Sequence, residues 1–477
     1  MEFDLNKKIN YYFKQISDIP RGSRNEKAIS DYVVEFAKAH GYDYIQDDVY
    51  NVIVNKPASK GYEDAEPVIL QGHMDMVCEK NKDIEHDFFK DPIDLYVDEE
   101  GWLKAKGTTL GADDGTGIAY MLAILDDDTI AHPELQCVFT VMEEIGLFGA
   151  IALKKDYFHA KRYINLDSGG EVRTTVSSAG GARAEMKRKL NYEPCSDPIY
   201  CLQIRGLQGG HSGGLIHLER GNAIIIGARV AYKLNQIFKD FRLVDLNGGM
   251  KFNAIPREVD ITFSSKTDLS SLKEKAEEIF DQIKTELEFS DEGFKGQIVE
   301  SESDKAISVK DSEEILEYLY VIPNGLQHRS MAIEGLTIAS LNAGVIHVEN
   351  DELIVSDLIR SAIASHGDEM IEKIEILSKH FNFNFELSDR YYGWNYEKNS
   401  PLREILRTVL KEKGIEMEER ASHGGLECGI FKGMIPDLDI ITYGPIAKGE
   451  HTPEEKLDLA SFDRAYENLL EVLKRCK

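Results

Sequence analysis

The chain has 477 residues, and this length predicts two or three domains. Hydrophobic residues make up 42%, enough for sizeable cores, while 84 acidic residues against 56 basic ones give a net charge of −28. Because such an acidic surface repels phosphate backbones and anionic lipid, roles in binding nucleic acid or membrane surfaces are disfavoured.

Targeting signals are also missing from the sequence pattern. We find no run of about 18–20 uncharged apolar residues that could span a membrane, and the first residues, MEFDLNKKINYYFKQ, lack the apolar core of a signal peptide. The six cysteines are scattered and form no CxxC pair. This pattern favours reduced thiols and argues against a thiolate zinc site. We therefore expect a cytoplasmic protein large enough to be an enzyme.

Short apolar runs alternate with helical patterns near both ends of the chain. Strands are predicted at residues 67–73, 135–142, 162–167 and 438–443, with helices near 117–125 and 459–474. Continuous apolar strands alternating with helices predict an α/β domain with a mostly parallel central sheet, covered on both faces.

The pattern changes between about residues 184 and 395. Alternating strands appear at 183–190, 200–206 and 258–264, beside long amphipathic helices. An internal echo is also present, because Phe252-Asn-Ala-Ile-Pro and Leu341-Asn-Ala-Gly-Val are each followed by a strand, a polar turn and a helix. We therefore predict one α/β domain formed by 1–183 and 396–477, interrupted by an inserted α+β domain at 184–395 that has an internal duplication.

Polar residues follow several of the predicted strands. They are His73 and Asp75, Glu143 with Glu144, Asp167 and His451, and the turn Gly111-Ala-Asp113-Asp114-Gly115 adds two carboxylates before a helix. Each one alone is also explained as a turn former, a solvated histidine or a helix cap, although capping accounts for only one of the two aspartates. Together they point to a ligand site, because the carboxyl ends of parallel strands meet at one edge of a sheet.

The chemistry of these groups favours metal ions. Two imidazoles and several carboxylates without a thiolate suit zinc, and also cobalt or manganese. Two divalent cations would bring four positive charges against the four carboxylates of Asp113, Glu143, Glu144 and Asp167. Such a pair would activate a shared water and polarise a carbonyl.

These motifs, in this order, resemble the co-catalytic zinc exopeptidases related to carboxypeptidase G2 and acetylornithine deacetylase. The resemblance is strongest to the aminoacyl-histidine (Xaa-His) dipeptidases, and it covers nearly the whole chain. It is carried by LQGHMDMVCEKN from Leu70, GTTLGADDGTG from Gly107, MEEIGLFG from Met142, NLDS from Asn165, GGHSGG from Gly209 and SHGGLEC from Ser422.

The resemblance implies a role for each matching residue. Asp113 would bridge two ions, with His73 and Asp167 completing one and Glu144 and His451 the other. Glu143 would be the general base and Asp75 would orient His73. The domain at 1–183 and 396–477 would be catalytic and the inserted domain at 184–395 a lid. In the lid, His211 would stabilise the tetrahedral oxyanion, while the candidate substrate contacts are Asn253, Asn342, Arg360 and His423. Relatives often carry Asn at position 114, so Asp113 is favoured as the bridge by its motif position.

The expected activity is hydrolysis of short peptides, including Xaa-His dipeptides, by water activated between two metals. Alternatives within the same superfamily are a tripeptide aminopeptidase, a carboxypeptidase or an N-acyl amino acid deacylase. A peptide- or metal-binding protein without catalysis is a further alternative, although a pure binder has no use for Glu143. The sequence leaves monomer and homodimer open.

Overall fold

A computed structural model describes residues 3–477, and the chain divides into two compact units. The first unit runs up to Ser177 and also contains Trp394–Ala421 and Leu426–Lys477, and the second contains Ser178–Gly393 and Ser422–Gly425. The sequence placed the domain breaks after residues 183 and 395, whereas the structure divides the chain after Ser177 and Gly393. The short segment Ser422–Gly425, which contains His423, packs with the second unit although it was expected in the catalytic domain.

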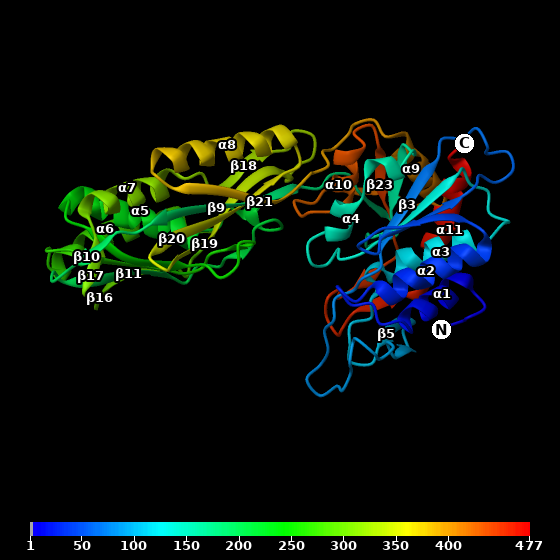
Figure 1. Cartoon of the computed structure of the whole chain (residues 1–477), viewed down its shortest axis with the longest axis horizontal. Helices are drawn as coiled ribbons and strands as arrows, with labels where there is room; N and C mark the ends of the chain where they lie inside the picture. Colours follow the sequence, from blue (N-terminus) through cyan, green and yellow to red (C-terminus); the bar gives the residue numbers. More distant parts are fainter. Residues whose placement is uncertain (1–2) are drawn as a thin grey trace. The chain divides into compact units, whose positions relative to one another are not determined.

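A six-stranded sheet forms the centre of the first unit (Figure 1). Its order is β1 (Asp43–Gln46), β2 (Val52–Lys56), β6 (Leu135–Thr140), β3 (Val68–His73), β7 (Arg162–Asn165) and β23 (Asp439–Thr442). Strand β3 pairs in parallel with β6 and β7, and β7 with β23, whereas β1 and β2 are antiparallel. The mostly parallel sheet predicted from the apolar runs is therefore confirmed.

Helices cover both faces of this sheet, as the continuous apolar strands require. One core joins β2, β3 and β6 to α1 (Lys8–Ser17), α2 (Lys27–His40), α3 (Ala112–Leu125), α9 (Pro401–Glu412) and α11 (Leu459–Arg475). Helix α3 is buried throughout from Ile118 to Leu125, because it lies in the middle of this layer. On the other face, Phe431 of α10 (Glu427–Met434) packs against Tyr163 of β7, with ring centroids 4.7 Å apart.

Smaller elements complete the first unit. A four-stranded antiparallel sheet has the order β24 (Ala447–Lys448), β25 (Lys456–Asp458), β5 (Trp102–Ala105) and β4 (Leu95–Val97). Strand β8 (Arg173–Thr175) pairs in parallel with β22 (Glu418–Arg420). The helices α4 (Phe148–Ala152) and η1 (Lys155–Tyr157) follow β6.

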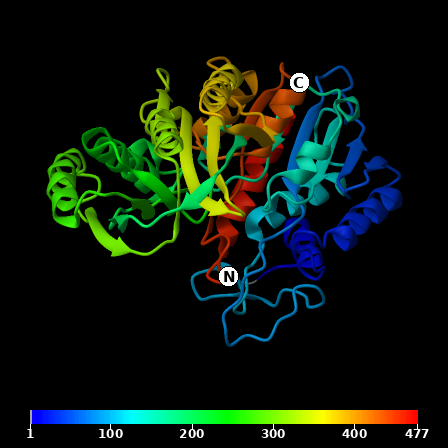
Figure 2. The same cartoon turned by 60° about the vertical axis from the view of Figure 1, so that its left-hand side comes forward.

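The second unit is built on a nine-stranded sheet (Figure 2). Its order is β16 (Lys295–Ser301), β11 (Ile199–Arg205), β15 (Val259–Ser264), β13 (Arg242–Gly248), β19 (Thr337–Glu349), β20 (Glu352–Ser361), β9 (Gly180–Lys189) and β21 (Asn384–Tyr391), and β18 (Gly325–Arg329) pairs with β19. Two short pairs, β10 (Tyr192–Pro194) with β17 (Lys305–Ile307) and β12 (Gly210–His211) with β14 (Ala254–Ile255), lie outside it.

The two halves of this sheet have the same topology. The first half runs β11, α5 (Ala223–Phe238), β13, β15, α6 (Leu269–Glu286), β16. The second half begins with β9 and, after the whole first half, continues with α7 (Val309–Val321), β19, β20, α8 (Ala364–His380) and β21. In space the orders are β13-β15-β11-β16 and β19-β20-β9-β21, so equivalent strands occupy equivalent places. The two sequence echoes precede the equivalent pairs β15–α6 and β20–α8.

The remaining element is η2 (Ile216–Leu218), which follows β12. Within residues 3–477, no helix combines the length and the apolar character that crossing a bilayer would require.

Candidate active site

The polar residues singled out in the first unit lie at one edge of its sheet. His73 is the last residue of β3, and Glu143 and Glu144 follow β6. The strands predicted to reach residues 142 and 167 end earlier, at Thr140 and Asn165, so the carboxylates occupy the turns beyond the strand ends. A turn leaves these side chains free to face the sheet edge, whereas strand pairing would direct neighbouring side chains to opposite faces.

Asp113 lies at the centre of this cluster. Its Oδ1 is 2.9 Å from Nε2 of His73, and its Oδ2 is 3.2 Å from Nε2 of His451, which lies in the turn between β24 and β25. One group of potential ligand atoms joins His73, Asp113 and Asp167, and another joins Asp113, Glu144 and His451. Within each group all three atoms lie within 4.8 Å of one another, and Asp113 belongs to both.

The neighbouring Asp114 has a different role. It is buried, and its Oδ1 accepts the backbone N–H of Gly117 at 3.1 Å in the first turn of α3. Its Oδ2 is buried without a hydrogen-bond partner among the described residues. One aspartate of the pair therefore accepts a backbone N–H near the start of α3, while the other faces the cluster.

The electrostatics of the cluster favour added positive charge. Burial, reinforced by the charge of Asp113, raises the pKa of Asp167 well above its usual value. Burial opposes the charge of His73, but Asp113 and Asp75 outweigh it and raise the pKa of this imidazole. Hydrogen bonds to Asp113 and Glu144 raise the pKa of His451 to about 10. The metal-free cluster therefore retains protons that a bound cation would replace.

Glu143 lies beside this cluster, within the third group of neighbouring ligand atoms, with His73 and Glu144. Burial raises the pKa of Glu143 to about 8, and the nearby charges of Glu427 and Glu144 add to the effect. A carboxylate with a raised pKa that faces ionic neighbours is suited to accept and return a proton near neutral pH.

Asp75 connects the metal-ligand candidate His73 with the segment that carries Glu143. Nδ1 of His73 lies 3.1 Å from its main-chain oxygen and 3.5 Å from its carboxylate. The carboxylate also accepts the Ser23 hydroxyl at 2.8 Å and the backbone N–H of Glu143 at 3.0 Å. Asp75 thus orients His73 through its main chain as well as its side chain.

Two charged residues of the site were not predicted from sequence. The buried carboxylate of Glu455 accepts the backbone N–H groups of Leu110, Gly111, Ala112 and Asp113 at 2.7–3.2 Å. The buried guanidinium of Arg21 donates to the carbonyls of Met74 and Asp75 at 2.9 and 3.1 Å and also to Gly111. Both hold the backbone that carries the cluster. In the sequence, Glu455 is marked only by its position four residues after His451, and Arg21 lies far from every predicted site residue.

The candidate residues of the second unit form a group of their own. Burial and the nearby charge of Arg360 lower the pKa of His211, and the same causes lower the pKa of His423 to about 3. Both imidazoles are therefore neutral at physiological pH. Nε2 of His423 lies 2.7 Å from the Ser340 hydroxyl.

Asn342 lies on the same strand as Ser340 and fixes a neighbouring loop. Its Nδ2 donates to the carbonyls of Phe252 and Ala254 at 3.0 and 2.9 Å, on either side of Asn253. The main-chain oxygen of Asn253 in turn accepts the N–H of Ser212, the residue after His211. Asn342 thus positions the Asn253 segment, while its own Oδ1 stays buried without a partner among the described residues.

Two cavities adjoin the cluster in the first unit. One of about 250 Å³ is lined by Asp113, Asp167, Ser168 and Glu450, among others. The other, of about 660 Å³, lies beside Glu144 and is lined largely by apolar groups, namely Met76, Val77, Phe88, Phe89 and Ile145. The second lies within the usual range for small-molecule sites, about 300–1,000 Å³.

The fold and this site define the class of protein. Residues 69–475 match the model of peptidase family M20/M25/M40, and the chain belongs to this family of peptide hydrolases. Over 471 residues it is 36% identical to the cytosol non-specific dipeptidase of Escherichia coli (strain K12), covering 97% of this chain and 96% of that protein.

Solved structures agree with this assignment. The aminoacylhistidine dipeptidase from Vibrio alginolyticus superposes with a TM-score of 0.91 at 33% identity, covering 98% of this chain and 96% of that one. Aminopeptidase PepT from Bacillus cereus superposes with a TM-score of 0.57 at 16% identity over the whole of both chains, which shows a shared fold.

The residues present fit a pair of metal ions, consistent with a metal-dependent family. Two imidazoles and several carboxylates offer two overlapping three-ligand groups. In addition, Oε1 of Glu144 is buried without a hydrogen-bond partner in the described part of the chain. A buried, unpaired carboxylate oxygen is costly unless a cation is bound to it.

Proposed function

We propose that this chain is a dinuclear metallo-dipeptidase in which Asp113 bridges two divalent ions. The observation that carries this proposal is the sharing of one carboxylate by two three-ligand groups, with its two oxygens directed at His73 and His451. His73 and Asp167 would complete one site, and Glu144 and His451 the other. The nitrogen and oxygen ligands favour Zn²⁺, while Co²⁺ and Mn²⁺ suit the same set.

When bound, the metal pair supplies Lewis acidity that polarises the peptide carbonyl and lowers the pKa of an attacking water. Glu143 accepts the proton of that water and returns it to the leaving amine. Its raised pKa supports this role, because a base and acid with a pKa near the working pH performs both transfers. Asp75 is a positioning residue that holds His73 and the Glu143 backbone together.

We assign the second unit to substrate recognition. His211, neutral at physiological pH, would donate a hydrogen bond to the oxyanion formed at the carbonyl carbon. Arg360 would bind the substrate carboxylate, for which a guanidinium offers a planar, bidentate set of donors. Asn253, Asn342 and His423 would be further substrate-binding residues. Asn342 would act by holding the loop that carries Asn253.

The substrates proposed are dipeptides, including Xaa-His dipeptides, and the site of action proposed is the cytoplasm. The names of the Escherichia coli and Vibrio alginolyticus relatives support this choice. The apolar cavity beside Glu144 offers space for one large substrate side chain. None of the features described for this site favours a tripeptidase, a carboxypeptidase or a deacylase over a dipeptidase.

A substrate panel with defined metal content tests the proposal. Purified chain is stripped with a chelator, reloaded with Zn²⁺, Co²⁺ or Mn²⁺, and assayed with dipeptides, tripeptides and N-acyl amino acids. We expect activity to return at two ions per chain and to be highest on dipeptides. Full activity without metal, or preference for N-acyl amino acids, would refute the proposal.

A further inference from the structure

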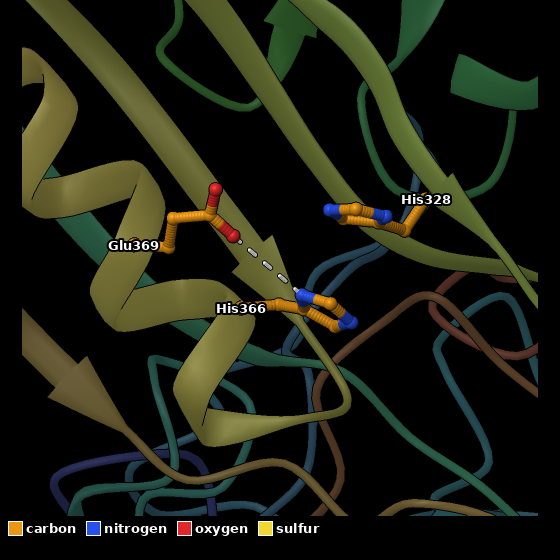
Figure 3. A group of neighbouring side chains, drawn as sticks. All are labelled: His328, His366 and Glu369. Atoms are coloured by element: carbon orange, nitrogen blue, oxygen red, sulfur yellow. Dashed lines mark ion pairs between the residues drawn. The ribbon is translucent and has the colours of Figure 1, made fainter.

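A second group of metal-ligand side chains lies in the second unit, outside the Asp113 cluster. It consists of His328 on β18 and of His366 and Glu369 on α8 (Figure 3). Their candidate ligand atoms all lie within 4.8 Å of one another. The residues come from two elements separated in the sequence by strands β19 and β20, so local chain geometry alone does not explain their meeting.

The orientation of the side chains leaves ligand atoms free. The imidazoles of His328 and His366 stack face to face, with centroids 4.0 Å apart and planes inclined by 22°. Stacking uses the ring faces and leaves the nitrogens at the ring edges available. Within residues 3–477 neither imidazole hydrogen-bonds to another protein group, and Figure 3 shows a nitrogen of each ring on the side that faces Glu369.

The carboxylate of Glu369 offers one free oxygen to this space. Its Oε1 accepts Lys373 Nζ at 2.7 Å, whereas its Oε2 lies 3.9 Å from Nδ1 of His366. That separation is too long for a hydrogen bond. It is close to the separation of about 3.4 Å between two tetrahedral zinc ligands at their usual bond lengths. An imidazole binds a metal in the plane of its ring, so one of the two stacked rings must rotate out of the stack before all three atoms can bind one ion.

We propose that His328, His366 and Glu369 form a third metal site, which takes a zinc-type divalent cation. Two imidazoles and one carboxylate, with water in a fourth position, form a recognised zinc ligand set. Half the Glu369 side chain and a third of the His366 side chain are exposed, so an ion and its water can reach the site. The bound ion would connect β18 to the N-terminal part of α8.

An ion bound at the third site would also restrain the surroundings of β18 within the second unit. Arg329, next to His328, forms an ion pair with Glu219 at the end of η2, in the segment that follows His211. An ion at the third site would therefore fix β18 between α8 and the segment beyond His211. We expect the site to stabilise this region rather than to take part in catalysis.

Zinc binding to the full chain tests the proposal. Native protein with its catalytic metals loaded is dialysed against a series of Zn²⁺ concentrations, and bound metal is measured by mass spectrometry. At the same Zn²⁺ concentration we expect the native protein to hold one more ion per chain than His366→Ala or His328→Ala. In these variants the affinity for that ion should fall roughly tenfold or more, since even outer partners of metal ligands contribute 10–100-fold. His380→Ala, at the far end of α8, is the matched control and should retain the ion.

Hydrogen exchange supplies a local measurement. The additional Zn²⁺ should slow exchange of the backbone amides at 325–336 and 364–370 in the native chain and in His380→Ala, but not in His366→Ala or in Glu369→Gln. The proposal is overturned if the histidine variants bind the same number of ions with the same affinity. It is also overturned if added Zn²⁺ leaves exchange in these segments unchanged, which would identify the extra ion as adventitious.

Discussion

The carboxylate of Asp75 accepts the backbone N–H of Glu143 at 3.0 Å, and the same carboxylate lies 3.5 Å from Nδ1 of His73. One side chain thus connects the end of β3, which carries His73, with the turn after β6, which carries the proposed base. The carboxylate of Asp75 also accepts the Ser23 hydroxyl and the backbone N–H of Glu144, so a single buried group contacts both segments.

Replacing the proposed base should separate catalysis from metal binding. In Glu143→Gln the side chain keeps its shape but loses its proton-accepting oxygen, so we expect kcat to fall about 10²–10⁴-fold. Metal content, measured by mass spectrometry, should remain as in the native chain. Glu134→Gln, before β6, is the control and should be unaffected. Unchanged turnover in Glu143→Gln would remove this residue from the mechanism.

Metal binding should release protons and strengthen as the pH rises. His73, His451 and Asp167 have raised pKa values in the metal-free chain, and a cation must displace the protons that they hold. For each proton displaced, affinity should increase about tenfold per pH unit. Competition with a chromogenic chelator at pH 6, 7 and 8 measures this slope. A pH-independent affinity would contradict the protonation states described here.

Glu455 should support the metal centre without being a ligand. Its carboxylate holds four consecutive N–H groups that end at Asp113, and the amide of Glu455→Gln cannot accept all of them. We expect metal affinity to fall about 10–100-fold, as for other groups that hold a ligand in place. The matched control is Glu454→Gln, an exposed neighbour. Chelator competition measures the affinity, and circular dichroism checks the fold. Native-like affinity in Glu455→Gln would show that this support is dispensable.

The apolar cavity beside Glu144 should influence substrate choice. Ile145 lines this cavity and is 37% exposed, so Ile145→Lys places a charge there without emptying the core. We expect kcat/KM for dipeptides with leucine or phenylalanine to fall about tenfold or more relative to dialanine, because pocket contacts of this kind contribute about 1–3 kcal/mol. Ile151→Lys, on α4 and also exposed, is the control. An equal loss for all dipeptides would exclude this cavity as a side-chain site.

Asp357 should make the stability of the second unit depend on pH. It is buried in β20 with neither carboxylate oxygen hydrogen-bonded among residues 3–477, and burial raises its pKa to about 7 from an ordinary 3.8. Between pH 4 and 7 the unfolded chain releases a proton that the folded chain keeps. The contribution of this group to stability therefore falls as the pH rises through that window and is level above it.

Asp357→Asn removes this dependence. Its free energy of unfolding relative to that of the native chain should rise between pH 5 and pH 7, by up to about 1.4 kcal/mol per pH unit, and then stay constant. Thermal unfolding of both chains at several pH values provides the measurement, with exposed Asp281→Asn as the control. A constant difference across the whole range would show that Asp357 is ionised throughout.

Local sequence patterns predicted much of the fold and the cluster. The apolar runs at β3, β6, β7 and β23 identified the parallel sheet, because strands buried on both faces need continuous apolar residues. The polar residues after those strands pointed to His73, Glu144, Asp167 and His451, since parallel strands present their carboxyl ends at one edge. The choice of Asp113, in the turn before a helix, came from its position in the motif of the resembling family. The predicted strand ends at 142 and 167 were too late, because hydrogen-bond pairing, which apolar character does not report, ends at Thr140 and Asn165.

By itself, the sequence determined the sheet, the order of the motifs and the ligand types that meet at its edge, because these depend on short-range periodicity and side-chain chemistry. Only the tertiary structure decided that Glu455 and Arg21 hold the backbone around Asp113, and that His328 meets His366 and Glu369. Those contacts join residues far apart in the chain, and their partners are chosen by how helices and strands pack, which local patterns do not record.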